Sequence, residues 1–75
     1  QDKDELLIMA LSRILEIDSE DEIALWKRAE AHYESKKLGD SMGDIHKLLA
    51  LNPGNQKARK FKAMILEKLD AKEWE

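Results

Sequence analysis

The stretch LSRILEIDSEDEIA (residues 11–24) returns in chemical type 34 residues later, as IHKLLALNPGNQKA (residues 45–58). The apolar positions that are kept stay in register. Nine of the fourteen aligned positions keep their chemical type: Leu11/Ile45, Arg13/Lys47, Ile14/Leu48, Leu15/Leu49, Ile17/Leu51, Asp18/Asn52, Asp21/Asn55, Glu22/Gln56 and Ala24/Ala58. A period of this length is typical of stacked helical arrays, which usually serve as binding scaffolds. The repeat therefore favours a protein that holds a partner over one that catalyses a reaction.

Length and composition predict one small all-α domain over residues 1–75. The chain is 39 % charged and 43 % hydrophobic, with three glycines and one proline, which suits amphipathic helices. It has no cysteine, which excludes disulfides and thiolate metal sites and fits a reducing, cytoplasmic location. The apolar run LLIMAL (residues 6–11) is shorter than the roughly 20 residues that cross a bilayer, so we expect no membrane insertion. Acidic residues precede this run, which argues against a signal peptide.

The net charge of −3 hides an asymmetry along the chain. Residues 1–22 carry eight acids and two bases, whereas residues 55–75 carry six bases and four acids. Nucleic-acid binding needs a net basic footprint, so we expect no nucleic acid as partner. The run KARKFK (residues 57–62) is interpreted as a solvated helix face, with a phosphate contact as the alternative.

Apolar periodicity predicts four helices, at about residues 4–17, 22–35, 39–51 and 56–72. The first carries one apolar face at helical spacing. The connections are short, so successive helices should be antiparallel neighbours. The expected apolar stripes of the first, third and fourth helices are Leu7, Leu11, Ile14 and Leu15; Met42, Ile45, Leu48 and Leu49; and Ala58, Phe61, Ile65 and Leu69.

Two helix starts and a set of small residues sharpen this prediction. Asp21 and Asn55, related by the repeat, are placed to cap the second and fourth helices. Asn52-Pro53-Gly54-Asn55 is a strong turn signal. Alanines at three positions of the second helix allow another helix to approach closely: Ala24, Ala29 and Ala31.

At this point the chain resembles a tetratricopeptide repeat. Ala29 and Ser41 match the small positions of the two helices of a repeat, and Pro53 matches its closing proline. The large apolar positions are matched by Leu25, Leu38, Ile45, Leu48 and Leu51. The resemblance implies a right-handed superhelical stack: the second helix of a partial repeat (about 4–17), a full repeat (about 22–51), and a next first helix or capping helix (about 56–72). Three residues depart from the pattern: Lys36 replaces a frequent glycine, Arg28 a common leucine and His32 a usual tyrosine.

The resemblance also implies a concave groove that binds a peptide or a partner protein. Its positions in this chain are Ile23, Trp26, Glu30 and Tyr33, at i, i+3, i+7 and i+10, which share one helical face. Tryptophan and tyrosine bring large contact areas with a polar group, which suits recognition. The alternative is that Trp26 and Tyr33 pack against the fourth helix or an absent neighbour.

Some tetratricopeptide proteins grip the acidic tail of heat-shock chaperones with a carboxylate clamp. The clamp positions of this repeat are matched by Ile23 and Lys27. Lys27 can meet a carboxylate as a point charge rather than a bidentate fork, whereas Ile23 cannot meet one at all. A co-chaperone adaptor with an incomplete clamp is therefore an alternative function, and we expect a chaperone tail peptide to bind weakly.

No pattern in the sequence favours catalysis, a cofactor or a metal site. His32 and His46 match no ligand spacing, and the many acids are expected to lie on solvated helix faces. The chain is therefore interpreted as a non-catalytic protein.

The first helix carries more apolar surface than the second can cover, through Leu6, Ile8, Met9 and Ala10. Bare apolar surface of this kind marks interfaces. It predicts a homodimer, preferably paired symmetrically through this helix, with a head-to-tail stack or a place within a longer repeat array as the alternatives.

Overall fold

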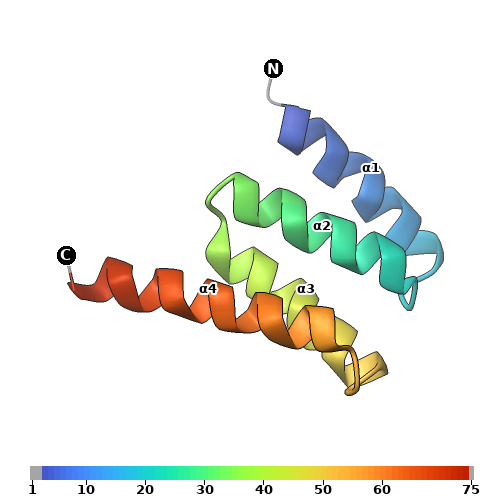
Figure 1. Ribbon diagram of the computed structural model, residues 1–75. Coiled ribbons are helices and arrows are strands. Elements are labelled where there is room, and N and C mark those ends of the chain that lie inside the picture. The colour runs from blue at the N-terminus through green and yellow to red at the C-terminus, as the bar shows by residue number, and fades with distance from the viewer. Residues whose placement is uncertain (1–2, 75) are drawn as a thin grey trace.

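The computed structural model describes the backbone of residues 3–74 and the side chains of residues 3–70. It contains four helices in the order α1 (Lys3–Ile17), α2 (Glu22–Glu34), α3 (Leu38–Leu51) and α4 (Gln56–Trp74) (Figure 1). No strand occurs in this part of the chain, so the all-α class is confirmed. The helix ends differ from the expected ones by one or two residues. Of the expected domain over residues 1–75, residues 1, 2 and 75 lie outside the description.

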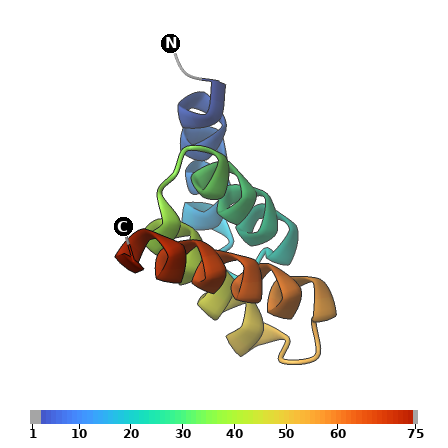
Figure 2. The same ribbon diagram turned by 60° about the vertical axis from the view of Figure 1, so that its left-hand side comes forward.

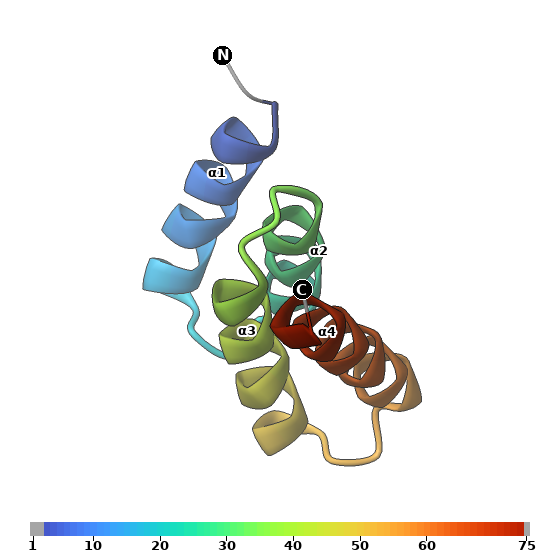
Figure 3. The same ribbon diagram turned by 90° about the vertical axis from the view of Figure 1, so that its left-hand side faces the viewer.

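The helices form two layers, with α1 and α3 in one and α2 and α4 in the other (Figures 2 and 3). Each helix packs on the next along the chain: α1 on α2, α2 on α3 and α3 on α4. Successive helices run in opposite directions (Figure 1), because short connections allow only antiparallel packing of neighbouring helices.

The two N-caps expected from the repeat are confirmed. The Ala24 N–H donates to Oδ1 of Asp21 over 3.1 Å, and the Ala58 N–H donates to Oδ1 of Asn55, also over 3.1 Å. Each side chain thereby satisfies one of the free amides at a helix start. The repeated residues consequently begin α2 and α4 in the same way.

The link between α2 and α3 contains one residue with a strained backbone conformation. The Lys36 N–H donates to the carbonyl of Tyr33 and the Lys37 N–H to that of His32, over 3.0 and 2.8 Å. These are the two bonds of a Schellman ending, which needs a left-handed residue between helix and link. Lys36 supplies it, with φ of +65°, and Lys36 is the one described non-glycine residue with positive φ. Lys36, which stands where tetratricopeptide repeats frequently have glycine, therefore lies at a position where glycine would adopt this conformation without strain.

The core lies between the two layers and is built from every helix. The three small residues of α2 are all buried, which lets α1 and α3 approach it closely. The apolar stripe expected for α4 is confirmed, with Leu69 half-buried at its end. The buried apolar residues are Leu11, Leu15, Ala24, Leu25, Ala29, Ala31, Ile45, Leu48, Ala58, Phe61 and Ile65.

One part of the expected packing is wrong. Leu11 and Leu15 of α1 are buried, but Leu7 and Ile14, which were assigned to the same face, are exposed. The periodicity is present, but α2 covers only one side of the apolar surface. The remaining side of α1 therefore stays open.

A polar network ties the first three helices together. The Arg28 guanidinium donates to both carboxylate oxygens of Asp44, over 2.9 and 2.7 Å, and to Oγ of Ser12 over 3.0 Å. The Asp44 hydrogen bond raises the pKa of Arg28 above its ordinary value. Ser41 Oγ donates to the Ala29 carbonyl over 2.8 Å. Arg28 on α2 thus reaches α1 on one side and α3 on the other.

Candidate partner-binding site

The residues predicted to bind a partner lie along the outer side of α2, but not all are equally free. Ile23 is 69 % exposed, and Lys27 and Glu30 are exposed as well. Trp26 and Tyr33 are half-buried. The two aromatic residues therefore have a packing role within the chain in addition to any role in recognition.

Phe61 of α4 lies between these two aromatic residues. Its ring centroid is 5.2 Å from that of Trp26 and 5.1 Å from that of Tyr33, with the rings tilted by 56° and 54°. Tilted pairs at this spacing are favourable arrangements for aromatic rings. Packing against the fourth helix, one of the two interpretations of Trp26 and Tyr33, is thus what the structure shows. We call Trp26, Tyr33 and Phe61 the aromatic cluster.

The aromatic cluster joins α2 to α4 and keeps part of two rings in contact with solvent. Sequence reasoning placed Phe61 in the buried stripe of the fourth helix, which the structure confirms, but missed its contact with Trp26 and Tyr33. A signal was present, because Phe61 is the repeat counterpart of Lys27, an exposed position. Phe61 itself is buried, so it supports the two partly exposed rings from within rather than forming part of the surface.

The two sides of the aromatic cluster differ in charge. Over residues 56–70, α4 carries five bases and two acids. Lys57, Lys60 and Lys68 are exposed, and Nζ of Lys68 lies 6.0 Å from the Tyr33 ring centroid. The α2 side contributes the exposed acids Glu30 and Glu34. A partner along this surface would therefore meet positive charge on α4 and negative charge on α2.

Lys27 and Glu30 also line an open groove of about 410 Å³ between α1 and α2. Its other lining residues are Asp4, Leu7, Ala31 and Glu34. Three carboxylates around one lysine disfavour an anionic ligand. This groove, together with the apolar Ile23, gives no structural support to a carboxylate clamp.

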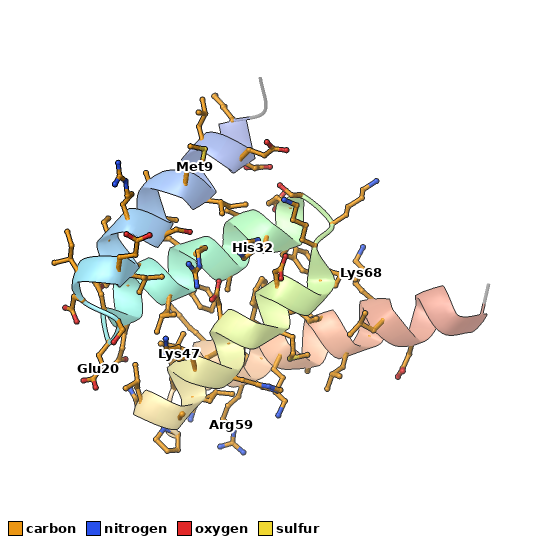
Figure 4. All side chains as sticks on the ribbon, turned by 180° about the vertical axis from the view of Figure 1, so that it is seen from behind. Met9, Glu20, His32, Lys47, Arg59 and Lys68 are labelled. Carbon is orange, nitrogen blue, oxygen red and sulfur yellow. The ribbon has the colours of Figure 1, made fainter. Side chains whose placement is uncertain are left out.

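A second apolar surface lies on α1. Leu6, Met9 and Ala10 are exposed and Ile8 is half-buried. Figure 4 shows this side of the molecule, with Met9 labelled on α1. Ile8, Met9 and Ala10 line a shallow groove with Ser12, Arg13 and Glu16. Together with Leu7, Ile14 and Ile17, which are also exposed, they form a larger apolar surface than the sequence predicted.

The histidines occupy different environments. His32 is buried, with Nε2 at 3.6 Å from the Asp44 carboxylate, whereas His46 is exposed. Burial lowers the pKa of His32, although Asp44 and Asp40 act in the opposite direction. Among the residues described, no group of three or more His, Asp or Glu side chains is arranged to hold a metal ion. None of the described helices is both long enough and apolar enough to span a membrane.

Comparison with protein families, curated proteins and solved structures found no match to this chain.

Proposed function

We propose that this chain is a non-catalytic protein-interaction module that binds a peptide segment of a protein partner along α2 and α4. The binding residues are Ile23, Trp26, Lys27, Glu30 and Tyr33, with Phe61 supporting the two aromatic rings. The observation that carries the proposal is the aromatic cluster, since it leaves Trp26 and Tyr33 half-buried next to the exposed Ile23. Aromatic residues held rigidly at a surface lose little entropy on binding and are frequent hot spots.

The tetratricopeptide resemblance supports the same proposal. Ala29 and Ser41, the two small positions, meet through the hydrogen bond between them. The left-handed Lys36 stands where the resemblance places glycine. In an array of this kind the first helices of successive repeats, here α2 and α4, would line the binding surface.

The experiment selects binding peptides from a displayed library of random sequences, measures their affinity by calorimetry and follows Trp26 fluorescence as the sign of contact at the aromatic cluster. Trp74→Phe removes the second tryptophan signal. Ile23→Glu is the informative variant, because Ile23 is exposed and its replacement leaves the core intact. The matched control is Ala50→Glu, on the exposed side of α3. We expect Ile23→Glu to lower the affinity about tenfold or more, as for a typical hot-spot residue, and Ala50→Glu to leave it unchanged.

Trp26→Ala is a less specific test than Ile23→Glu. Replacing the Trp26 side chain removes its contact with Phe61 as well as any contact with a partner. Selected peptides that bind Ile23→Glu as tightly as the parent chain, with no change in Trp26 fluorescence, would place the binding surface elsewhere.

A further inference from the structure

The contacts between α2 and α3 show which side of each helix faces the other. We call this the closing side of the helix. Ser41 lies against Ala29 and Asp44 against Arg28, as their hydrogen bonds show. Residues one turn away lie on the same helical side. The closing side of α3 is therefore Ser41, Asp44, Leu48 and Leu51, and the closing side of α2 is Leu25, Arg28, Ala29 and His32.

The repeat assigns each of these α3 positions a counterpart in α1. The counterparts of Ser41, Asp44, Leu48 and Leu51 are Leu7, Ala10, Ile14 and Ile17. Leu48 is fully buried, whereas Ile14 is 42 % exposed and Ile17 is 90 % exposed. We call Leu7, Ala10, Ile14 and Ile17 the α1 open face. The α1 open face corresponds to the side of α3 that α2 covers, and it is more apolar than that side.

The same comparison identifies an uncovered side on α4. The counterparts of Leu25, Arg28, Ala29 and His32 are Arg59, Lys62, Ala63 and Leu66. Ala29 and His32 are buried, whereas Ala63 is exposed and Leu66 is 45 % exposed. We call Arg59, Lys62, Ala63 and Leu66 the α4 open face.

Other positions of these helices, next to the open faces, provide the internal control. Ala24 of α2 and its counterpart Ala58 of α4 are both buried, as are Ala31 and its counterpart Ile65. Leu11 of α1 and its counterpart Ile45 of α3 are buried too. At these positions the counterparts are equally buried, whereas at the two open faces they are not. α1 lacks the helix that α2 provides for α3, and α4 lacks the helix that α3 provides for α2.

We propose that copies of this chain stack head to tail, with α4 of one copy packed on α1 of the next as α2 packs on α3. Each contact covers the α4 open face of one copy and the α1 open face of its neighbour. In this register Ala63 takes the place of Ala29, and Leu7 takes the place of Ser41. A symmetrical pairing of two α1 helices, expected from the sequence, would leave the α4 open face bare. The head-to-tail contact covers both faces, and it extends the two layers from one copy to the next.

Charge complementarity supports a second copy as the occupant. Residues 3–22, around α1, carry seven acids and two bases, whereas residues 56–70 of α4 carry five bases and two acids. Arg59 takes the place of the buried Leu25, and its long stem lets the charged end reach the edge of the contact. The antiparallel register brings Arg59 beside Ile14, and Asp18 lies one turn further on, where its N–H donates to the Ile14 carbonyl. Arg59 and Asp18 are therefore the pair expected to meet.

The test uses two variants that each block one face. Ile14→Glu places a charge on the α1 open face, and Leu66→Glu places one on the α4 open face. Both positions are partly exposed, so the fold of the single chain should survive, which circular dichroism checks. Ile17→Glu and Ala63→Glu replace them if either variant unfolds. Sedimentation velocity over a range of concentrations then measures the mass of the wild type, each variant and their equimolar mixture.

We expect the wild-type mass to rise with concentration beyond a dimer, because a head-to-tail contact leaves one free face at each end of the assembly. Each variant alone should remain a monomer, since its one free face meets only blocked ones. Their mixture should give a one-to-one heterodimer that grows no further. Ala50→Glu, on the exposed side of α3, should behave as the wild type, and added salt should weaken the assembly.

Three results would overturn the proposal. They are a wild type that stays monomeric at every concentration, a mixture of the two variants that does not form the heterodimer, and dimers of Leu66→Glu alone, which would instead establish symmetrical pairing through α1. Peptide binding at the aromatic cluster is measured separately on the monomeric variants. Failure of one proposal therefore does not count against the other.

Discussion

α3 and α1 share the same apolar register 34 residues apart, but the two helices have different surroundings. Among the described residues, α3 packs extensively on both α2 and α4, whereas α1 packs extensively on α2 and on no other helix. Leu48 of α3 is completely buried, while its counterpart Ile14 of α1 remains partly exposed. The comparison shows that a periodic pattern specifies which side of a helix is apolar. Whether that side is buried depends on a neighbour that the pattern itself does not contain.

The largest expected difference between the two helices is in stability. Leu48→Ala should lower the free energy of unfolding by about 3 kcal/mol, because it leaves a cavity in the core. Ile14→Ala should lower it by at most about 1 kcal/mol, since part of that side chain is already in water. Chemical denaturation followed by circular dichroism measures both, at concentrations low enough to suppress association. Equal losses in the two variants would mean that α1 is covered as completely as α3.

The second prediction concerns Asp44, whose counterpart in α1 is Ala10. Asp44→Ala should lower the free energy of unfolding by about 2–3 kcal/mol, because Arg28 is left with a half-buried and unpaired charge. Replacing both partners, as Arg28→Leu with Asp44→Leu, should restore most of the loss, since hydrophobic residues can replace such a pair. Double-mutant analysis by chemical denaturation tests this. An Asp44→Ala variant as stable as the wild type would show that the ion pair between Arg28 and Asp44 does not hold α2 to α3.

The third prediction concerns the link that closes α2 onto α3. Lys36→Gly should raise the free energy of unfolding by about 1 kcal/mol, because a left-handed residue other than glycine is strained by about that amount. Lys37→Gly is the matched control, since Lys37 has an ordinary φ of −95°. This second variant should give no gain. Thermal unfolding measures the melting temperature of both variants. Equal shifts in the two variants would contradict a role for the left-handed conformation of Lys36.

The smallest expected effect is a pH dependence that α2 has and α4 lacks. Burial lowers the pKa of His32 in the folded chain, so the unfolded chain binds the proton more readily. The stability from the neutral side chain is therefore fully present above about pH 6.5 and is lost as the pH falls below it. Arg28 and Lys37 favour the neutral form, whereas Asp44 and Asp40 oppose it.

His32→Leu tests this dependence, because leucine is the residue that α4 carries at the counterpart position, Leu66. The free energy of unfolding of the wild type should fall more than that of His32→Leu between about pH 6.5 and pH 5, the range just below the ordinary histidine pKa. Parallel curves for the two proteins would show that His32 does not contribute.

Much of the fold could be predicted from local sequence, since its signals are short-range. The caps at Asp21 and Asn55 act on amides three residues away, and the stripe of α4 follows from helical spacing alone. The open side of α1 was recognised through Leu6 and Met9, but Leu7 and Ile14 were assigned to the core. Their exposure depends on how many helices surround α1, which periodicity does not encode.

The candidate site shows the same division. The sequence identified Trp26 and Tyr33 as one side of a helix, and it left open whether they bind a partner or pack within the chain. Only the packing of α4 brings Phe61 between them. Arg28 was noticed as a departure from a pattern, and its role became clear only when Asp44 and Ser12 were found on either side of it.

The sequence by itself determined four helices, the first residues of α2 and α4 and the apolar sides, because hydrogen bonds and side-chain spacing within a helix are local. The tertiary structure decided which of these sides are covered. It also decided that an arginine, an aspartate and a serine from three helices would share one network. These outcomes depend on the distances between residues far apart in the chain, and such distances are fixed only when the helices pack.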